Sequence, residues 1–195
     1  KDLGHPLTIK PHTFPQTNSD DQLIISLTTE QKYIFDARGW LVIPGVLNSS
    51  DLEEMRLFCQ RLQKEPESIP AEQRSTYGGP LQRLMDHPVV VGFANEFLAA
   101  PYLSSQDCYG FRMEMSFAAF RSAKGQIETP FSPHNGNGMW RMPSDCHEYR
   151  CIPGKAFAGL TRVVWELNVV EEGDGGTLFI TGSHKSAFTA PKSAY

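Results

Sequence analysis

The sequence predicts an α+β fold in which helices come first and an antiparallel sheet follows. Two capping boxes, which are helix start signals, lie in the first 55 residues. After residue 110 the apolar residues change from helical spacing to two-residue alternation, the period of a strand. Tight turns separate the last alternating segments, which favours antiparallel pairing.

Three helices are predicted. The first follows the capping box Thr28-Thr29-Glu30-Gln31 and is expected to end at Gly39. The second follows the box Ser50-Asp51-Leu52-Glu53 and runs to about Lys64, and residues 65–80 form a loop. The third has Pro88 in its first turn. Apolar residues at helical spacing are Leu52, Met55, Phe58 and Leu62 in the second helix and Val89, Phe93, Phe97 and Leu98 in the third.

Four strands are predicted, at residues 40–43, 111–117, 163–169 and 177–180. Apolar and polar residues alternate most clearly in 111–117 and 163–169. Between these two segments, residues 121–159 are so rich in Gly and Pro that we expect little room for long elements.

Composition predicts one globular domain. The chain has 195 residues, 40% hydrophobic residues and a net charge of −4. We expect residues 27–195 to form this domain and residues 1–26, broken by three prolines, to be an arm laid over it or a mobile tail. The chain begins at Lys1 without a signal-peptide pattern, which suggests a trimmed or partial chain. No apolar run is long enough for a membrane span, and scattered basic residues give no nucleic-acid footprint.

The four cysteines are expected to be free thiols in a reducing compartment, which predicts a cytoplasmic protein. They are Cys59, Cys108, Cys146 and Cys151. Cys146-His147 with Cys151 lacks the paired short spacings of a structural zinc site.

Two of the six histidines stand out by their context. His134 lies in a glycine-rich segment whose backbone can approach a bound group closely, and His184 follows a predicted strand. They are 50 residues apart, and a sheet could bring them together. By themselves they are a weak signal for a metal site.

Two segments resemble the phytanoyl-CoA dioxygenase family. Residues 39–47 (Gly-Trp-Leu-Val-Ile-Pro-Gly-Val-Leu), followed by a capped helix, are similar to its N-terminal part. Residues 174–186 (Asp-Gly-Gly-Thr-Leu-Phe-Ile-Thr-Gly-Ser-His-Lys-Ser) are similar to its distal histidine motif. The resemblance covers roughly residues 30–190.

The resemblance implies a double-stranded β-helix (jelly roll) of antiparallel strands, with the N-terminal helices packed on one sheet. It also implies an oxygenase that uses Fe(II), 2-oxoglutarate as cosubstrate and O₂. His134 and His184 would then be metal ligands and catalytic residues. In the family a carboxylate two positions after the first histidine completes the ligand set, leaving open positions on the iron.

The chain departs from this pattern at the third ligand. Gly136 stands two positions after His134 and cannot bind iron. A His-x-Gly arrangement resembles the iron halogenases of the wider superfamily, in which chloride takes the place of the carboxylate. Alternatively, Asp145 or Glu148 supplies the third ligand, or iron is not bound.

Two other departures concern the distal segment. Thr181 stands where the family usually has Pro. The family expects an Arg about ten residues past the distal histidine to pair with 2-oxoglutarate, and this chain stops at Tyr195. Lys185 and Lys192 are poor substitutes for a bidentate Arg. Either the C-terminal strands are missing from this chain or the cosubstrate site is incomplete.

The polar face of the predicted strand 163–169 supplies further candidates. Arg162, Glu166 and Asn168 share that face. In a jelly roll they would line the cavity, where Arg162 and Asn168 are our candidates for cosubstrate binding; otherwise they are the solvent face of the strand.

The leading functional hypothesis is an oxygenase that hydroxylates a C–H bond of a small organic substrate. A halogenase using the same site is its variant. The alternative from another class is a jelly-roll module that binds a ligand without catalysis, and a purely structural domain comes third.

Overall fold

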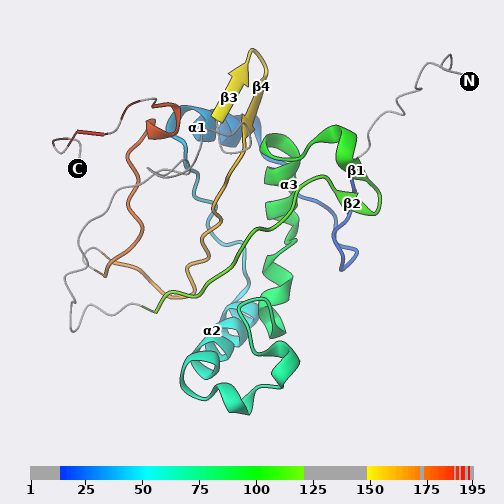
Figure 1. The fold of residues 1–195 in the computed structure, drawn as a ribbon, viewed down its shortest axis with the longest axis vertical. Coiled ribbons are helices and arrows are strands. Elements are labelled where there is room, and N and C mark those ends of the chain that lie inside the picture. The colour runs from blue at the N-terminus through cyan, green and yellow to red at the C-terminus, as the bar shows by residue number, and fades with distance from the viewer. Residues whose placement is uncertain are drawn as a thin grey trace, which may run out of the picture.

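The computed structural model describes residues 14–120, 149–171, 174–186, 188, 190, 191 and 193. Its helices and strands are short, and Figure 1 shows α3 running between a lower group around α2 and an upper group around α1 and β3–β4. The elements are α1 (Thr29–Arg38), α2 (Ser49–Lys64), α3 (Pro88–Phe97), β1 (Ser104–Ser105), β2 (Cys108–Tyr109), β3 (Tyr149–Ile152) and β4 (Lys155–Ala158).

Helix α1 begins and ends where the sequence predicts. The Thr28 hydroxyl accepts from the Gln31 amide, and the Gln31 side chain accepts from the Thr28 amide, which is the predicted capping box. Gly39 adopts the left-handed conformation at φ 81°, and its N–H donates to the Phe35 carbonyl at 2.7 Å. The α1 prediction is confirmed.

Helix α2 begins two residues earlier than the second capping box predicts. Its cap is Asn48, whose side-chain oxygen accepts from the Asp51 amide at 2.9 Å. Ser50 therefore lies inside the first turn, and the capping box at Ser50 was the wrong start signal. The helix ends at Lys64, as predicted.

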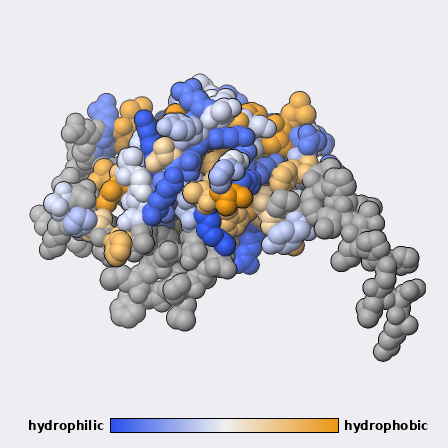
Figure 2. Space-filling model, turned by 90° about the horizontal axis from the view of Figure 1, so that it is seen from above, coloured by the Kyte–Doolittle hydropathy of each residue, from blue (hydrophilic) through white to orange (hydrophobic). Residues whose placement is uncertain are grey.

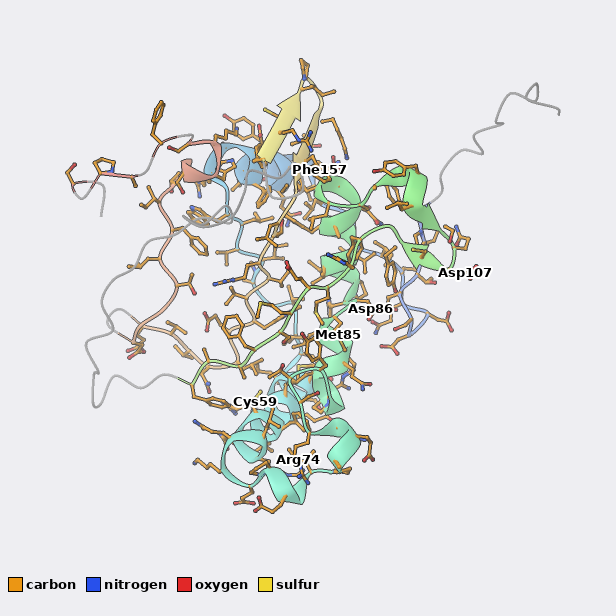
Figure 3. All side chains as sticks on the ribbon, in the orientation of Figure 1. Cys59, Arg74, Met85, Asp86, Asp107 and Phe157 are labelled. Atoms are coloured by element: carbon orange, nitrogen blue, oxygen red, sulfur yellow. The ribbon has the colours of Figure 1, made fainter. Side chains whose placement is uncertain are left out.

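A hydrophobic cluster holds α2 against the segment that follows it. Residues 65–80, predicted as a loop, contain 3-10 helices at Pro66–Ser68 and Ala71–Gln73 and the start of a third at Gly79–Leu84. Cys59, labelled in Figure 3, lies in this cluster as a buried free thiol. Its buried members are Met55, Phe58, Cys59, Ile69 and Leu81.

Helix α3 starts at Pro88, and the His87 ring accepts from the Val89 amide at 3.3 Å. Of the predicted stripe, only Phe97 is buried, and Val89, Phe93 and Leu98 are partly buried. The buried face also includes Gly92, which touches the N-terminal segment. A Cβ at Gly92 would lie 1.8 Å from the Ile25 carbonyl oxygen. The Ile25 amide also donates to the Pro88 carbonyl, so residues near 25 lie directly on α3.

A second hydrophobic cluster joins α1, α3 and β4. Phe35 lies at its centre, with its ring centroid 4.7 Å from those of both Phe93 and Phe97. The buried members of the cluster are Leu27, Phe35, Phe97, Ala156 and Ala158. Packing against α3 and α1 together therefore places the β3–β4 hairpin.

The β3–β4 hairpin lies in a stretch for which the sequence predicted little regular structure. Four residue pairs join the strands, from Tyr149 opposite Ala158 to Ile152 opposite Lys155. A Pro153-Gly154 turn connects them, and Gly154 has a φ of 81°. The sequence did not predict this hairpin because its strands are only four residues long and lie in a segment rich in Gly and Pro, which favours loops.

None of the four predicted strands forms a ladder, although all four segments belong to the described chain. Figure 1 shows them as irregular ribbons. At Ser116, for example, the amide donates to the Tyr77 hydroxyl and the carbonyl accepts from Thr76. Alternation makes a strand only where a neighbouring strand takes the backbone hydrogen bonds.

The sheets of the described residues are two antiparallel pairs, β1–β2 and β3–β4. The jelly roll with helices packed on one sheet stays a prediction. Several apolar residues of the unpaired segments are exposed, among them Met115 at 68% and Leu178 at 75%, and Figure 2 shows apolar patches among hydrophilic ones. Within the described ranges, no helix has the length and apolar character needed to cross a bilayer.

Candidate functional site

The two segments that carry the family resemblance meet at the C-terminal end of α1. The Gly182 amide donates to the Arg38 carbonyl at 2.8 Å. The Trp40 indole N–H donates to the Thr181 hydroxyl at 3.1 Å, and its ring stacks on Phe179 with centroids 6.1 Å apart. Residues separated by some 140 positions in the chain are thereby brought together around His184.

His184 is seated on the last turn of α1. It lies in a 3-10 turn at Ser183–Lys185 and is partly buried. Its Nε2 is 2.9 Å from the backbone carbonyl oxygen of Asp36. The ring meets that of Tyr149 edge to face, with centroids 4.6 Å apart. Because a carbonyl oxygen only accepts, Nε2 carries the proton in this arrangement and Nδ1 carries the lone pair.

Gly39 gives His184 the room to approach α1. A Cβ at residue 39 would lie 2.3 Å from Nδ1 and 2.5 Å from Cγ of His184. Nδ1 is buried against this glycine and has no hydrogen-bond partner among the residues that the structure describes. Gly39 is therefore required both for the left-handed helix cap and for the close approach of the imidazole.

Burial favours a neutral His184 ring, whereas the charges of Lys185 and Asp36 shift its pKa in opposite directions. Burial lowers the pKa of His184, and the positive charge of Lys185 acts in the same direction, while the hydrogen bond to the Asp36 carbonyl opposes them. A neutral imidazole is the form that binds metals.

The Asp36 side chain ties the same three segments together. Its carboxylate accepts from the Tyr149 hydroxyl and pairs with the Lys185 ammonium at 3.0 Å. The Tyr149 hydrogen bond and then Lys185 hold the pKa of Asp36 below its usual value. Burial and the Asp36 carboxylate raise the pKa of Tyr149. The Asp36–Lys185 pair is largely solvated, so it contributes little to stability by itself.

In this conformation His184 does not fit an iron ligand. Nε2 faces the Asp36 carbonyl, and Nδ1 faces Gly39, the residue that caps α1. Neither ring nitrogen is therefore accessible to a metal ion. Within the ranges that the structure describes, no group of three or more His, Cys, Asp or Glu is placed to hold a metal. Iron binding by His184 requires the ring to move away from the Asp36 carbonyl and Gly39.

The other residues of the predicted metal site lie outside the described residues. These are His134, Gly136, Asp145 and Glu148, and the Cys146-His147 pair lies there too. The pairing of His134 with His184 stays a prediction.

The candidates for cosubstrate binding are exposed. Arg162 places its guanidinium 5.6 Å from the centre of the Phe117 ring. Asn168 and Glu166 are exposed as well. Lys185 is engaged by Asp36, and Lys192 is outside the described residues. The roles predicted for Arg162 and Asn168 therefore stay predictions.

Sequence reasoning missed the residues that hold His184. Asp36 lies in α1 and Tyr149 in β3. The spacing of apolar residues in these segments indicates only local secondary structure, and nothing in the sequence links either residue to His184. Gly39 was identified as a helix end, but its second role is visible only in three dimensions. One sequence signal for this second role was available: Gly39 both caps a helix and is the first residue of the segment 39–47 that resembles the family.

Two surface depressions lie elsewhere on the molecule. One, of about 320 Å³, is lined mainly by polar side chains that include Glu54, Arg83 and Asp86. Asp86, labelled in Figure 3, accepts from the Ser19 amide at 2.9 Å and the Tyr109 hydroxyl at 2.7 Å. The other, of about 350 Å³, lies along α2 and includes Leu57. Neither depression is lined by a residue that contacts His184.

Comparisons with protein-family models, curated proteins and solved structures found no match to this chain.

Proposed function

We propose that this chain is a non-haem Fe(II)- and 2-oxoglutarate-dependent oxygenase that hydroxylates a C–H bond of a small organic substrate. His134 and His184 are the proposed iron ligands, and Arg162 and Asn168 are the proposed contacts for 2-oxoglutarate. The observation that carries the proposal is the segment 174–186, whose Gly-Gly, Gly-Ser-His and Lys positions follow the distal histidine motif of the phytanoyl-CoA dioxygenase family.

One contact supports this proposal. The segments at 39–47 and 174–186, which carry the resemblance separately, contact each other through Trp40 and Thr181. We place the activity in the cytoplasm because the cysteine spacing favours free thiols.

Halogenation at the same site is the variant that Gly136 suggests, because a glycine there leaves a coordination position for chloride. The variant Gly136→Asp distinguishes the two outcomes. It would move a halogenase towards hydroxylation, whereas an unchanged product would remove the argument for an open chloride position.

The test of the proposed function is an anaerobic titration of the apo-protein with Fe(II) and 2-oxoglutarate, with and without chloride. We expect a weak visible charge-transfer band that is lost in His134→Ala and in His184→Ala. A band that survives both substitutions would place the metal elsewhere. A chloride-dependent shift of the band would favour the halogenase.

A second candidate is a ligand-binding module without catalysis. The closed position of both His184 nitrogens favours it, because the ring then serves to dock one segment on another. Failure of the protein to consume 2-oxoglutarate at any iron loading, together with retained 2-oxoglutarate binding, would select this candidate.

A further inference from the structure

In this structure the His184 ring is docked on the C-terminal end of α1, whereas the proposed function requires the same ring to bind iron. We propose that residues 181–186 form a latch that docks on the C-terminal turn of α1 through His184, and that metal binding by His184 requires this latch to open. The inference rests on the proposed function. It makes the docked segment and the metal-bound histidine mutually exclusive states of one chain.

The exclusion follows from the two ring nitrogens. Nε2 is 2.9 Å from the Asp36 carbonyl oxygen, a position that a metal cannot share. Nδ1 lies so close to Gly39 that even a methyl group there would be 2.3 Å away. Binding of a metal at Nε2 would also move the ring proton to Nδ1, for which the described part of the chain offers no acceptor in the docked position.

The latch is held by contacts besides those of the His184 ring. The Gly182 amide donates to the Arg38 carbonyl at 2.8 Å, and Lys185 pairs with Asp36 at 3.0 Å. The Trp40 indole donates to the Thr181 hydroxyl at 3.1 Å. The latch can therefore be weakened by substitutions that leave the proposed ligand intact.

Weakening the latch should strengthen metal binding. A ligand that binds only the open state loses apparent affinity in proportion to the fraction of molecules that are closed. One neutral hydrogen bond contributes about 1 kcal/mol, which corresponds to about a fivefold change in that equilibrium. If the closed state predominates, removing the Trp40–Thr181 bond tightens metal binding by about fivefold.

The experiment measures the affinity for Fe(II) anaerobically at saturating 2-oxoglutarate, in the wild type, Thr181→Val and Trp40→Phe. These two variants remove the same hydrogen bond from opposite sides, and Trp40→Phe keeps an aromatic ring beside Phe179. The matched control is Thr76→Val, which removes a hydroxyl hydrogen bond of equal length, 3.1 Å to the Ser116 carbonyl, outside the latch. His184→Ala identifies binding that does not involve His184.

A second readout follows the latch itself. The Gly182 amide should be protected from hydrogen exchange without metal, because it donates to Arg38, and should exchange faster once Fe(II) and 2-oxoglutarate are bound. A purely structural role of the segment would not couple this exchange to the metal.

The outcomes separate the inference from the proposed function. Tighter binding in both latch variants, with Thr76→Val unchanged and Gly182 released by metal, supports the coupling. His184-dependent binding with equal affinity in all variants and unchanged Gly182 protection overturns the latch while the proposed function stands. Absence of Fe(II) binding in every variant overturns both.

Discussion

Replacing Gly39 with alanine tests the closest contact in the candidate site. Gly39 has a φ of 81°, and a Cβ there would meet three atoms of the His184 side chain at 2.3, 2.5 and 3.0 Å. Alanine at this position therefore meets two separate obstacles. One is the strain of a left-handed backbone, and the other is the imidazole itself.

The two obstacles have different magnitudes. An L-residue in the left-handed region costs roughly 1–2 kcal/mol. Relief of the contact requires the His184 ring to move and give up its hydrogen bond to the Asp36 carbonyl, which costs about 1 kcal/mol more. Gly39→Ala should therefore lower the free energy of unfolding by about 2–3 kcal/mol.

Gly154 supplies the matched control. It has the same φ of 81°, and a Cβ there would meet no atom of the described residues within 4 Å. Gly154→Ala should show the backbone strain alone, about 1–2 kcal/mol. The assay is urea unfolding followed by circular dichroism, with both variants compared with the wild type at one pH.

A double-mutant cycle assigns the difference to His184. In a His184→Ala background, Gly39→Ala should cost no more than Gly154→Ala, because the side chain that collides with residue 39 is gone. Equal costs of Gly39→Ala and Gly154→Ala in the wild-type background would refute the reasoning. So would a Gly39→Ala cost that stays larger when His184 is absent.

Three further predictions concern the rest of the molecule. Met55 is only 1% exposed, and Met55→Ala should cost about 2–5 kcal/mol in urea unfolding, because truncation leaves a cavity. Gly92→Ala should cost about 1–3 kcal/mol by overpacking, since its Cβ would lie 1.8 Å from the Ile25 carbonyl oxygen; thermal unfolding at the wild-type midpoint would contradict this. Burial opposes ionisation of Asp86, but hydrogen bonds from Ser19 and then Tyr109 hold its pKa below the ordinary aspartate value of 3.8. The ionised Asp86 side chain therefore stabilises the folded protein above that pH, and this stabilisation is lost as the pH falls through the folded-state pKa. Asp86→Asn should make the free energy of unfolding less dependent on pH, as measured by unfolding curves between neutral pH and pH 2.

Local signals predicted the helices well. The bounds of α1 follow from groups within one turn of each end, namely Thr28 with Gln31 and Gly39 with Phe35. Such contacts depend on residues three or four positions apart, so the sequence contains them directly. The start of α2 is ambiguous in the sequence, because Asn48 and Ser50 are both favourable N-cap residues and only one of them, Asn48, caps the helix.

Pairing and burial of distant segments were decided by the tertiary structure. The alternation in 111–117 and 163–169 specifies which side chains share a face, but a strand also needs a neighbour for its backbone, and the sequence does not name one. The β3–β4 hairpin formed because its strands and turn are adjacent in the chain.

The candidate site divides in the same way. The sequence by itself identified His184 and the motif around it, because a short motif is a local property. Only the tertiary structure placed its ring on Asp36, 148 positions away, and closed it with Gly39 and Tyr149. Contacts across such a distance result from the packing of α1 and α3 against the β3–β4 hairpin. Their geometry is set by the whole cluster of buried side chains rather than by any one segment of sequence.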